Sequence, residues 1–211
     1  MNVQSLFIDY DGTIVDSVGL WVKAVNETLA DTHSSPLTKH DLSSKDLWEI
    51  LHERLGKDLW QINRHASHIW QKFAQKSAHG WRLFDGADST LRQLRGNGFK
   101  LVLVSKRAGD AAKRTRAELK RYGIDHLFNH IYLNIQHEAY GRKLREILSV
   151  LNFEPWQVAV ISDWVADLRV AKEIGFRTIG VLSGVSIRKE FAEAKVEVVI
   201  KSLNVVPQIV L

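Results

Sequence analysis

The sequence has 211 residues, 45% of them hydrophobic, and a net charge of +5, which suits a globular protein with one sizeable α/β core and about 60 residues to spare. The absence of cysteine excludes disulfide bonds, thiolate metal sites and a cysteine nucleophile. No apolar run approaches the roughly 18 residues of a membrane span, and the first residues lack the basic start of a signal peptide, so we expect a cytoplasmic protein without a membrane partner.

The first predicted element is a buried strand, because an apolar run at 6–8 ends abruptly in polar residues. Asp9 and Asp11 follow it with a spacing of two, and Gly12 allows a sharp turn after them. Because strand side chains alternate, both carboxylates are expected on the same side, able to face one metal ion or phosphate. Open parallel sheets bind their ligands at this carboxyl end.

Three helices are predicted next, because apolar residues recur at helical spacing, at about 17–30, 47–55 and 59–78. Ser17 is placed to cap the first of them. No strand candidate occurs among them, so we interpret 18–80 as a helical insertion after the first strand. We interpret its tryptophans as packing residues rather than substrate contacts; they are Trp21, Trp48, Trp60 and Trp70.

Beyond the insertion, strands alternate with helices, a pattern typical of a parallel sheet with right-handed crossovers. The strands are expected at 100–104, 130–133, 158–161, 178–182 and 196–200, with clear helices at 142–151 and 164–174. The stretch 106–121 carries seven Lys and Arg residues. We interpret it as the solvated face of a helix, because no aromatic platform for nucleic acid is interleaved with the charges.

Polar side chains follow two of these strands. Ser105 can hold a phosphate oxygen after the strand 100–104, and Asp163 and Asp167 follow the strand 158–161. A cation before the helix 142–151, Lys143 or Arg142, can neutralise a carboxylate lying beside a phosphoryl group. A carboxylate that attacks a phosphate needs a hard cation between the two, and Mg²⁺ suits a site of two or three carboxylates.

The segment Asp9-Tyr10-Asp11-Gly12-Thr13 resembles the first motif of the haloacid dehalogenase-like phosphohydrolases, and Ser105 and Asp163 follow in the family's order. Phe84-Asp85-Gly86 and 161–180 resemble its phosphoglycolate-phosphatase-like branch, which inserts a helical cap between the first two motifs. The resemblance implies an α/β fold: a Rossmann-like, three-layer parallel sheet core at 1–17 and 81–211 with an all-helical cap at 18–80.

The same resemblance implies roles for single residues. Asp9 would be the nucleophile that forms an aspartyl phosphate, and Asp11 the general acid and base. Mg²⁺ would be held by Asp9, the backbone carbonyl of Asp11 and Asp163, with Asp167 as a further ligand or beside the ligands. The substrate phosphate would be bound by Thr13, Ser105, Lys106 and Lys143, where Thr13 also steadies its loop.

Two of the departures from the family pattern concern cations. The segment 140–144 lacks the usual proline and lies closer to Asp163 than that branch usually allows, so Lys143 and Arg142 stay alternatives for the third-motif cation. Lys106 and Arg107 follow Ser105 where an asparagine is common.

We therefore expect a Mg²⁺-dependent phosphatase for a small phosphorylated metabolite, such as phosphoglycolate, a sugar phosphate or a nucleotide. We expect a monomer or homodimer without a nucleic-acid partner. The alternatives are a phosphomutase, a non-catalytic binding or regulatory module on the same fold, and a nucleic-acid phosphatase that uses the basic stretch 106–121.

Overall fold

The computed structural model describes residues 1–32, 35–45, 47–56, 58–80, 82–135 and 139–211. The described residues form a 6-stranded sheet in the order β3-β2-β1-β4-β5-β6, and every neighbouring pair is parallel. The strands are β1 Ser5–Asp9, β2 Lys100–Val104, β3 His130–Tyr132, β4 Val158–Ser162, β5 Arg177–Val181 and β6 Val198–Ile200. All predicted strands are confirmed, with small shifts at their ends.

β1 lies at the point in the sheet where the order in which the chain adds strands reverses. The chain runs from β1 to β2 and β3 on one side, then crosses to β4, β5 and β6 on the other. Ser5 of β1 pairs with Lys100 of β2 and with Val158 of β4, so these strands end at the same edge. A crevice outside this switch point is where open α/β sheets bind ligands.

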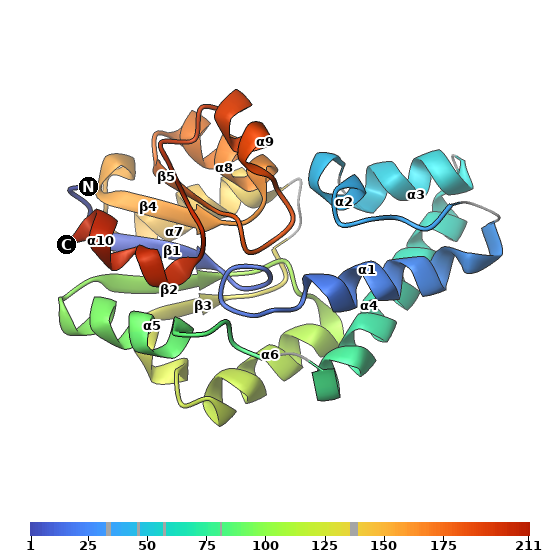
Figure 1. Ribbon diagram of the computed structural model, residues 1–211, viewed down its shortest axis with the longest axis horizontal. Helices are drawn as coiled ribbons and strands as arrows, with labels where there is room; N and C mark the ends of the chain where they lie inside the picture. The colour runs from blue at the N-terminus through green and yellow to red at the C-terminus, as the bar shows by residue number, and fades with distance from the viewer. Residues whose placement is uncertain (33–34, 46, 57, 81, 136–138) are drawn as a thin grey trace.

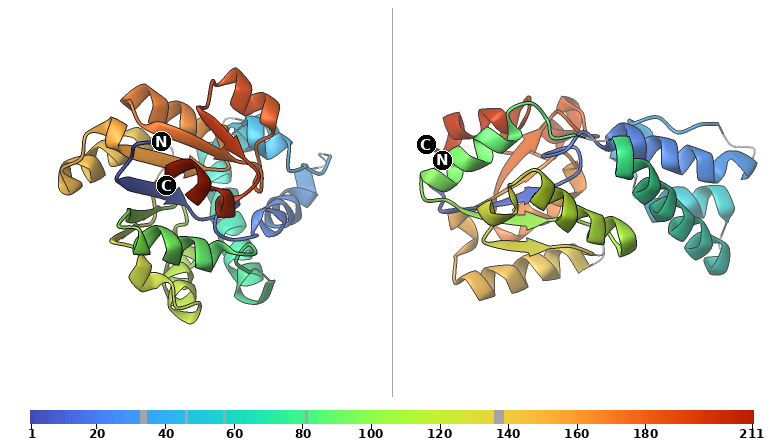
Figure 2. Two further views of the ribbon diagram at one scale, coloured as in Figure 1. Left: turned by 60° about the vertical axis from the view of Figure 1, so that its left-hand side comes forward. Right: turned by 90° about the horizontal axis from the view of Figure 1, so that it is seen from below.

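Helices cover both faces of the sheet, as Figures 1 and 2 show, which confirms the predicted α/β fold. The helices after the insertion are α5 Ala87–Gly96, α6 Gly109–Arg121, α7 Tyr140–Leu151, α8 Val165–Ile174, α9 Arg188–Glu193 and α10 Pro207–Val210. The 3₁₀ turns are η1 Ala30–Thr32, η2 Asp125–Leu127, η4 Pro155–Gln157 and η5 Leu203–Val205. Sequence periodicity missed α9 and α10, because neither is long enough to repeat an apolar face.

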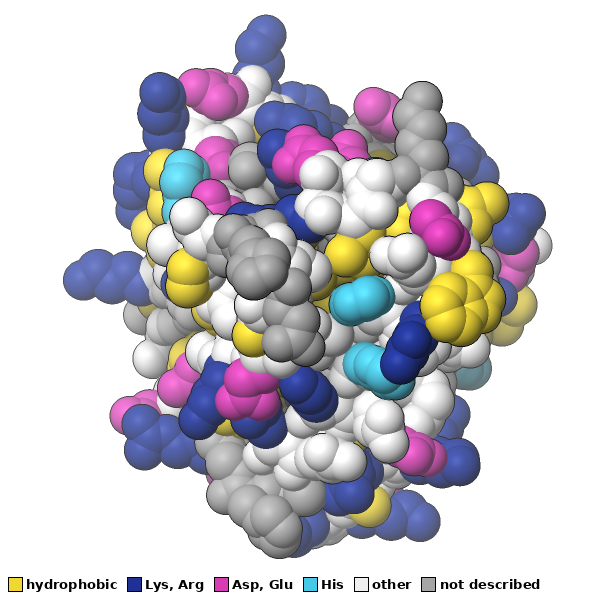
Figure 3. All heavy atoms as spheres, turned by 90° about the vertical axis from the view of Figure 1, so that its right-hand side faces the viewer, with side chains coloured by type: hydrophobic (Ala, Val, Ile, Leu, Met, Phe, Trp, Pro, Cys, Tyr) yellow, Lys and Arg dark blue, Asp and Glu magenta, His cyan; other side chains and the backbone are white. Residues whose placement is uncertain are grey.

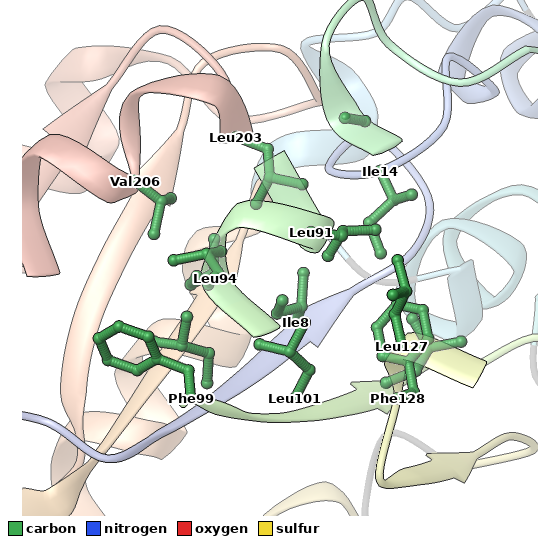
Figure 4. Packing of buried hydrophobic residues seen from close by; sticks show 14 of the residues in the cluster. Ile8, Ile14, Leu91, Leu94, Phe99, Leu101, Leu127, Phe128, Leu203 and Val206 are labelled. Carbon is green, nitrogen blue, oxygen red and sulfur yellow. The ribbon is translucent and has the colours of Figure 1, made fainter. Parts of the chain in front are cut away.

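The alternation of side chains along β1 divides the core into two clusters. Leu6 and Ile8 pack into one, whose members from β2, α5 and the C-terminal segment surround Ile8 in Figure 4. Phe7 packs into the other, beneath α7 and α8. Because all three side chains are fully buried, β1 reads in sequence as a continuous apolar run, as expected of a strand covered on both faces.

The segment 18–80 forms a helical lobe at one end of the molecule (Figures 1 and 2). Its helices are α1 Val18–Leu29, α2 Asp41–Ser44, α3 Leu47–Leu55 and α4 Leu59–Gly80. The three predicted helices are confirmed, and the four-residue α2 was missed. The lobe has its own buried cluster, which includes Val25, Leu51 and Ile69. The division into two domains stays a prediction, since its boundary residue Trp81 lies outside the described residues.

The helical lobe contacts the core on both sides of the strand ends. The indole Nε1 of Trp164 donates to the carbonyl of Ser43 at 3.2 Å, and the Ser43 hydroxyl donates to Glu190 at 2.7 Å. On the other side, Phe73 of α4 packs in one cluster with Ala111 of α6. In the part of the chain that is described, no helix has the length and apolar character of a membrane span.

Candidate active site

The carboxyl ends of three strands supply the polar wall of one cavity. Asp9 ends β1, Ser105 directly follows β2, and Asp163 directly follows β4. These residues, together with Asp11 and Lys106, line a cavity of about 450 Å³ whose wall also includes residues of the helical lobe. The structure therefore brings together five of the residues that the sequence marked as site candidates.

The carboxyl groups of Asp9 and Asp163 are buried, which makes a negative charge on either of them costly. Burial raises the pKa of Asp9 well above its ordinary value, and the charge of Asp163 raises it further. Burial also raises the pKa of Asp163, although the backbone N–H of Val185 donates to its Oδ2 at 2.7 Å. Two crowded carboxylates of this kind favour a cation or a proton between them.

Two glycines make room for Asp163. Gly184 approaches it so closely that a Cβ at that position would overlap the Asp163 side chain, and a Cβ at Gly12 would overlap its carboxylate. Gly12 also has a φ of +69°, a left-handed conformation that other residues rarely adopt. The Asp163 side chain is therefore fixed against the first loop by backbone on two sides.

Lys106 is the cation that lies near the carboxyl groups of Asp9 and Asp167. Its Nζ bonds the buried Asp167 and lies over the rings of Tyr140 and Trp164, 4.6 Å from each centroid. The positive charge of Lys106 also lowers the pKa of Asp9, against the larger effect of burial. Asp167 thus meets Lys106 rather than lining the cavity, and its buried Oδ1 has no hydrogen-bond partner among the described residues.

Lys143 and Arg142, the predicted third-motif cations, are not brought to this cavity. Lys143 pairs with Glu146 on α7 and lines a different pocket beside α6, and Arg142 is exposed. The reason is that α7 begins at Tyr140, two residues earlier than predicted. Both cations therefore stand on the helix itself, while the ring of Tyr140 contacts Lys106.

Thr13, predicted to bind phosphate, is also placed away from the cavity. Its side chain is fully buried, and its Oγ1 has no hydrogen-bond partner among the residues that the structure describes. The loop that contains it is held by backbone hydrogen bonds from Ile14 and Val15 to the carbonyl of Tyr10. Thr13 therefore belongs to the loop's packing rather than to the cavity wall.

Arg107 is a site residue that the sequence interpretation missed. Its guanidinium is fully buried and grips Asp11 with two hydrogen bonds, Nε to Oδ2 at 2.8 Å and Nη2 to Oδ1 at 2.7 Å. It lies over the rings of Tyr10 and Phe73, 4.7 and 5.0 Å from their centroids. The burial of such a charge requires partners of this kind, and bidentate carboxylate pairing supplies the strongest.

The basic stretch therefore divides into two parts. The interpretation as a solvated helix face is wrong for Arg107, because α6 begins only at Gly109 and the two cations before it lie in the loop after β2. It holds for the exposed residues of α6, which are Lys113, Arg114, Arg116, Lys120 and Arg121. The sequence carried one indication that these two cations belong to the site, because they come directly after Ser105 at the end of a predicted strand.

Ser17 occupies the predicted N-cap position of α1, but its side chain has another role. Its side chain makes no capping hydrogen bond to α1. Its hydroxyl instead donates to Oδ1 of Asp11. Arg107 and Ser17 together thus hold the Asp11 carboxylate from two directions.

A hard divalent cation fits this donor set. Asp9 and Asp163 offer carboxylates whose pKa values are raised by burial and, less strongly, by neighbouring carboxylates. Among the described residues, no group of three or more His, Cys, Asp or Glu side chains forms a complete metal site. Mg²⁺ does not require one, because it keeps several waters and binds through one or two carboxylates.

Comparisons with known proteins agree with this geometry. A sequence model of a family described as haloacid dehalogenase-like hydrolase matches residues 6–181. The phosphoglycolate phosphatase of Synechococcus elongatus is 24% identical over 194 residues, which cover 91% of this chain and 90% of that protein. The tyrosine-protein kinase PtkA of Mycobacterium tuberculosis is 27% identical over 183 residues, or 83% of this chain and 61% of that protein.

The fold is likewise shared with solved structures. A haloacid dehalogenase-like family hydrolase from Streptococcus pneumoniae superposes with a TM-score of 0.81 at 20% identity, covering 99% of this chain and 98% of that one. At this identity the likeness shows the fold alone.

Proposed function

Because this chain belongs to the haloacid dehalogenase-like hydrolase family and is a phosphatase enzyme of it, we propose that it hydrolyses a small phosphate monoester with the help of Mg²⁺. The observation that carries the proposal is the meeting of Asp9, Asp163 and Lys106 at the ends of neighbouring strands around one cavity. A nucleophile, a metal-binding carboxylate and a cation are the parts that phosphoryl transfer requires.

In the proposed first step, a carboxylate oxygen of Asp9 attacks phosphorus. A bond forms between that oxygen and phosphorus, the bond from phosphorus to the leaving oxygen breaks, and a proton from Asp11 passes to the leaving oxygen. Ser105 and Lys106 line the same cavity and would hold the phosphoryl oxygens. The products are the free alcohol and an aspartyl phosphate on Asp9.

In the second step, water attacks the aspartyl phosphate and Asp11 takes its proton, which releases phosphate and restores Asp9. Arg107 and Ser17 hold both oxygens of Asp11 in the structure. We infer that one oxygen turns from these partners toward the substrate during each proton transfer. Arg107 thereby acts as a positioning residue for the acid and base.

Mg²⁺ would be held by Asp9, Asp163 and the backbone carbonyl of Asp11, and when bound it supplies positive charge between the nucleophile and the phosphate. Asp167 would contribute by fixing Lys106 through their ion pair. Its other oxygen, Oδ1, is buried and has no hydrogen-bond partner among the described residues, so Asp167 would act beside the residues that hold the metal.

We propose that the helical lobe is the cap of this enzyme, with the domain boundaries expected from the sequence at 18–80. Its hydrogen bond from Trp164 to Ser43 seats it over the strand ends. Such a cover excludes water from the reacting groups. We further propose a cytoplasmic enzyme, monomeric or homodimeric, with no nucleic-acid or membrane partner.

Transfer to an acceptor other than water is the second candidate, since the similar PtkA is named a protein kinase. A phosphomutase would share this chemistry, with a sugar hydroxyl as the acceptor. The binding-module alternative is disfavoured by the complete set of Asp9, Asp11 and Asp163 around the cavity.

The test is phosphate release from a panel of phosphate monoesters, with Mg²⁺ and with a chelator, by the native protein and by Asp9→Asn. We expect metal-dependent release that Asp9→Asn abolishes. Release that survives Asp9→Asn would contradict the assigned nucleophile, and phosphate exchange between alcohols without net release would favour the mutase.

A further inference from the structure

The cavity above the strand ends extends into the helical lobe, where its walls become aromatic. Trp21, Trp48, Trp70 and Phe73 line it from the lobe, and Trp164 lines it from the core. Three of the four lobe tryptophans therefore line the cavity and also pack against the buried clusters of the lobe, as predicted. Trp60 alone among the four lobe tryptophans, all of them described, does not line the cavity, and it is 67% exposed.

The aromatic walls are held in place by their neighbours. Trp21 and Trp70 lie 4.6 Å apart between ring centroids, and Phe73 meets the edge of Trp21 at 5.2 Å. Trp164 is fixed by its hydrogen bond to Ser43. Rigid flat surfaces of this kind bind other flat rings at low entropic cost.

The cations that line the cavity are already engaged. Lys106 pairs with Asp167, Arg107 with Asp11 at 2.7 Å, and Lys45 with Glu53 at 2.5 Å. Among the described lining residues, each of these cations already has a carboxylate partner, so a carboxylate on the leaving group would compete with Asp167, Asp11 or Glu53 for it. A two-carbon acid such as glycolate would therefore bind without a cation of its own.

Volume leads to the same conclusion. A cavity of about 450 Å³ falls in the range of sites that enclose ligands of drug-like size, lined by apolar groups with a few polar ones that orient the ligand. The polar groups here gather at the carboxylate end, where the phosphate binds in the proposed reaction. The remainder of the cavity is left for an uncharged, apolar leaving group.

Resting on the proposed phosphatase function, we propose that the substrate is a phosphate monoester whose leaving group carries an uncharged, flat aromatic ring, which stacks on the lobe tryptophans. An aryl group and a nucleobase share this chemistry. The phosphate would lie at Asp9 and Ser105, and the ring would lie against Trp48 and the other aromatic residues that line the cavity.

The experiment compares substrates whose leaving oxygens are alike. The pairs are a nucleoside 5′-monophosphate against ribose 5-phosphate, and benzyl phosphate against cyclohexylmethyl phosphate, with phosphoglycolate as the small anionic reference. Because stacking of one base contributes about a five- to 150-fold difference, we expect kcat/KM at least tenfold higher for the aromatic member of one pair or both. The pair that shows the larger ratio separates the nucleobase from the aryl group.

Trp48→Leu keeps an apolar side chain but removes the flat ring, and Trp60→Leu is the matched control on the same lobe. Figure 3 shows the outer end of the lobe, where hydrophobic side chains are scattered among charged and polar ones. We expect Trp48→Leu to lower kcat/KM for the preferred aromatic substrate about tenfold, with partial recovery in Trp48→Phe. Trp60→Leu should stay within twofold of the native protein.

Binding to Asp9→Asn, followed by tryptophan fluorescence, tests the same inference without turnover. Tighter binding of benzyl phosphate than of phosphoglycolate supports the aromatic leaving group even if no substrate is hydrolysed. A lack of hydrolysis would contradict the phosphatase proposal but not this inference. A preference for phosphoglycolate in both turnover and binding would contradict the aromatic leaving group. Equal effects of Trp48→Leu and Trp60→Leu would contradict it too. Neither result would contradict the proposed phosphatase function.

Discussion

At the scale of single residues, Lys106 and Arg107 are adjacent in sequence but engage different carboxylates. Lys106 bonds Asp167 from between two aromatic rings, while Arg107 holds both oxygens of Asp11. One loop after β2 thus supplies a cation near Asp9, the proposed nucleophile, and another to Asp11, the proposed acid and base.

Lys106→Met should lower kcat/KM by about 100-fold or more, because a group aimed at developing charge contributes that much in enzymes of known mechanism. Lys143→Met should change it less than threefold, because Lys143 pairs with Glu146 outside the cavity. Steady-state kinetics on the two variants decides between the cations. A large loss of kcat/KM in Lys143→Met with little loss in Lys106→Met would support Lys143 as the third-motif cation, as predicted from the sequence.

Asp163→Asn should stabilise the metal-free protein at alkaline pH. The folded state raises the pKa of Asp163 above the ordinary 3.8, so it holds a proton that the unfolded chain has released. Stability is therefore lost as pH rises from about 4 through the raised pKa. We expect the variant to melt at least about 2 °C above the native protein at pH 8, with the difference shrinking at pH 5. An equal difference at both pH values would contradict this account.

At the scale of elements, the loop after β5 determines where Asp163 stands. Gly184 in that loop and Gly12 in the loop after β1 press against the side chain of Asp163 from two sides. Val185 adds the hydrogen bond that orients its carboxylate. The position of this carboxylate therefore depends on segments from three strands.

Gly184→Ala should displace Asp163, because an added Cβ has no space beside it. We expect a loss in kcat/KM of about 100-fold or more and weaker Mg²⁺ binding. Gly19→Ala is the control: its Cβ would meet nothing within 4 Å, and alanine favours helix α1 by up to about 1 kcal/mol. Kinetics and thermal melting on both variants separate the local effect from unfolding, and a fully active Gly184→Ala protein would refute the packing argument.

At the scale of the whole molecule, the proposed active site is lined by the ends of the sheet strands and by the helical lobe. The sheet supplies the carboxylates and Lys106, and the helical lobe supplies most of the apolar cavity wall. Ligands that bind only the folded site draw on both parts, so their binding adds to the stability of the entire fold.

Mg²⁺ should raise the melting temperature of the native protein, because it relieves the crowding of Asp9 and Asp163. At 100 times its dissociation constant a ligand adds about 2.7 kcal/mol, which corresponds to a shift of about 5–10 °C in a protein of this size. We expect the shift to be largest at pH 8 and nearly absent in Asp163→Asn. A shift of equal size in the native protein and in Asp163→Asn would place the metal elsewhere.

The sequence by itself determined the parallel sheet, the order of its strands along the chain and the helical nature of 18–80. These features follow from local periodicity, since β1, β2 and β4 are buried on both faces and therefore uniformly apolar. It also marked Asp9, Asp11, Ser105, Lys106 and Asp163, because each of them ends a strand or closely follows one.

Only the tertiary structure decided which groups meet. Lys106 rather than Lys143 reaches the site because α7 starts at Tyr140, and Arg107 is buried because its loop turns toward Asp11 and Phe73. Trp48 and Trp60 look alike in sequence, yet one lines the cavity and the other faces solvent. Such differences depend on packing between segments far apart in the chain, which periodicity within a single segment does not encode.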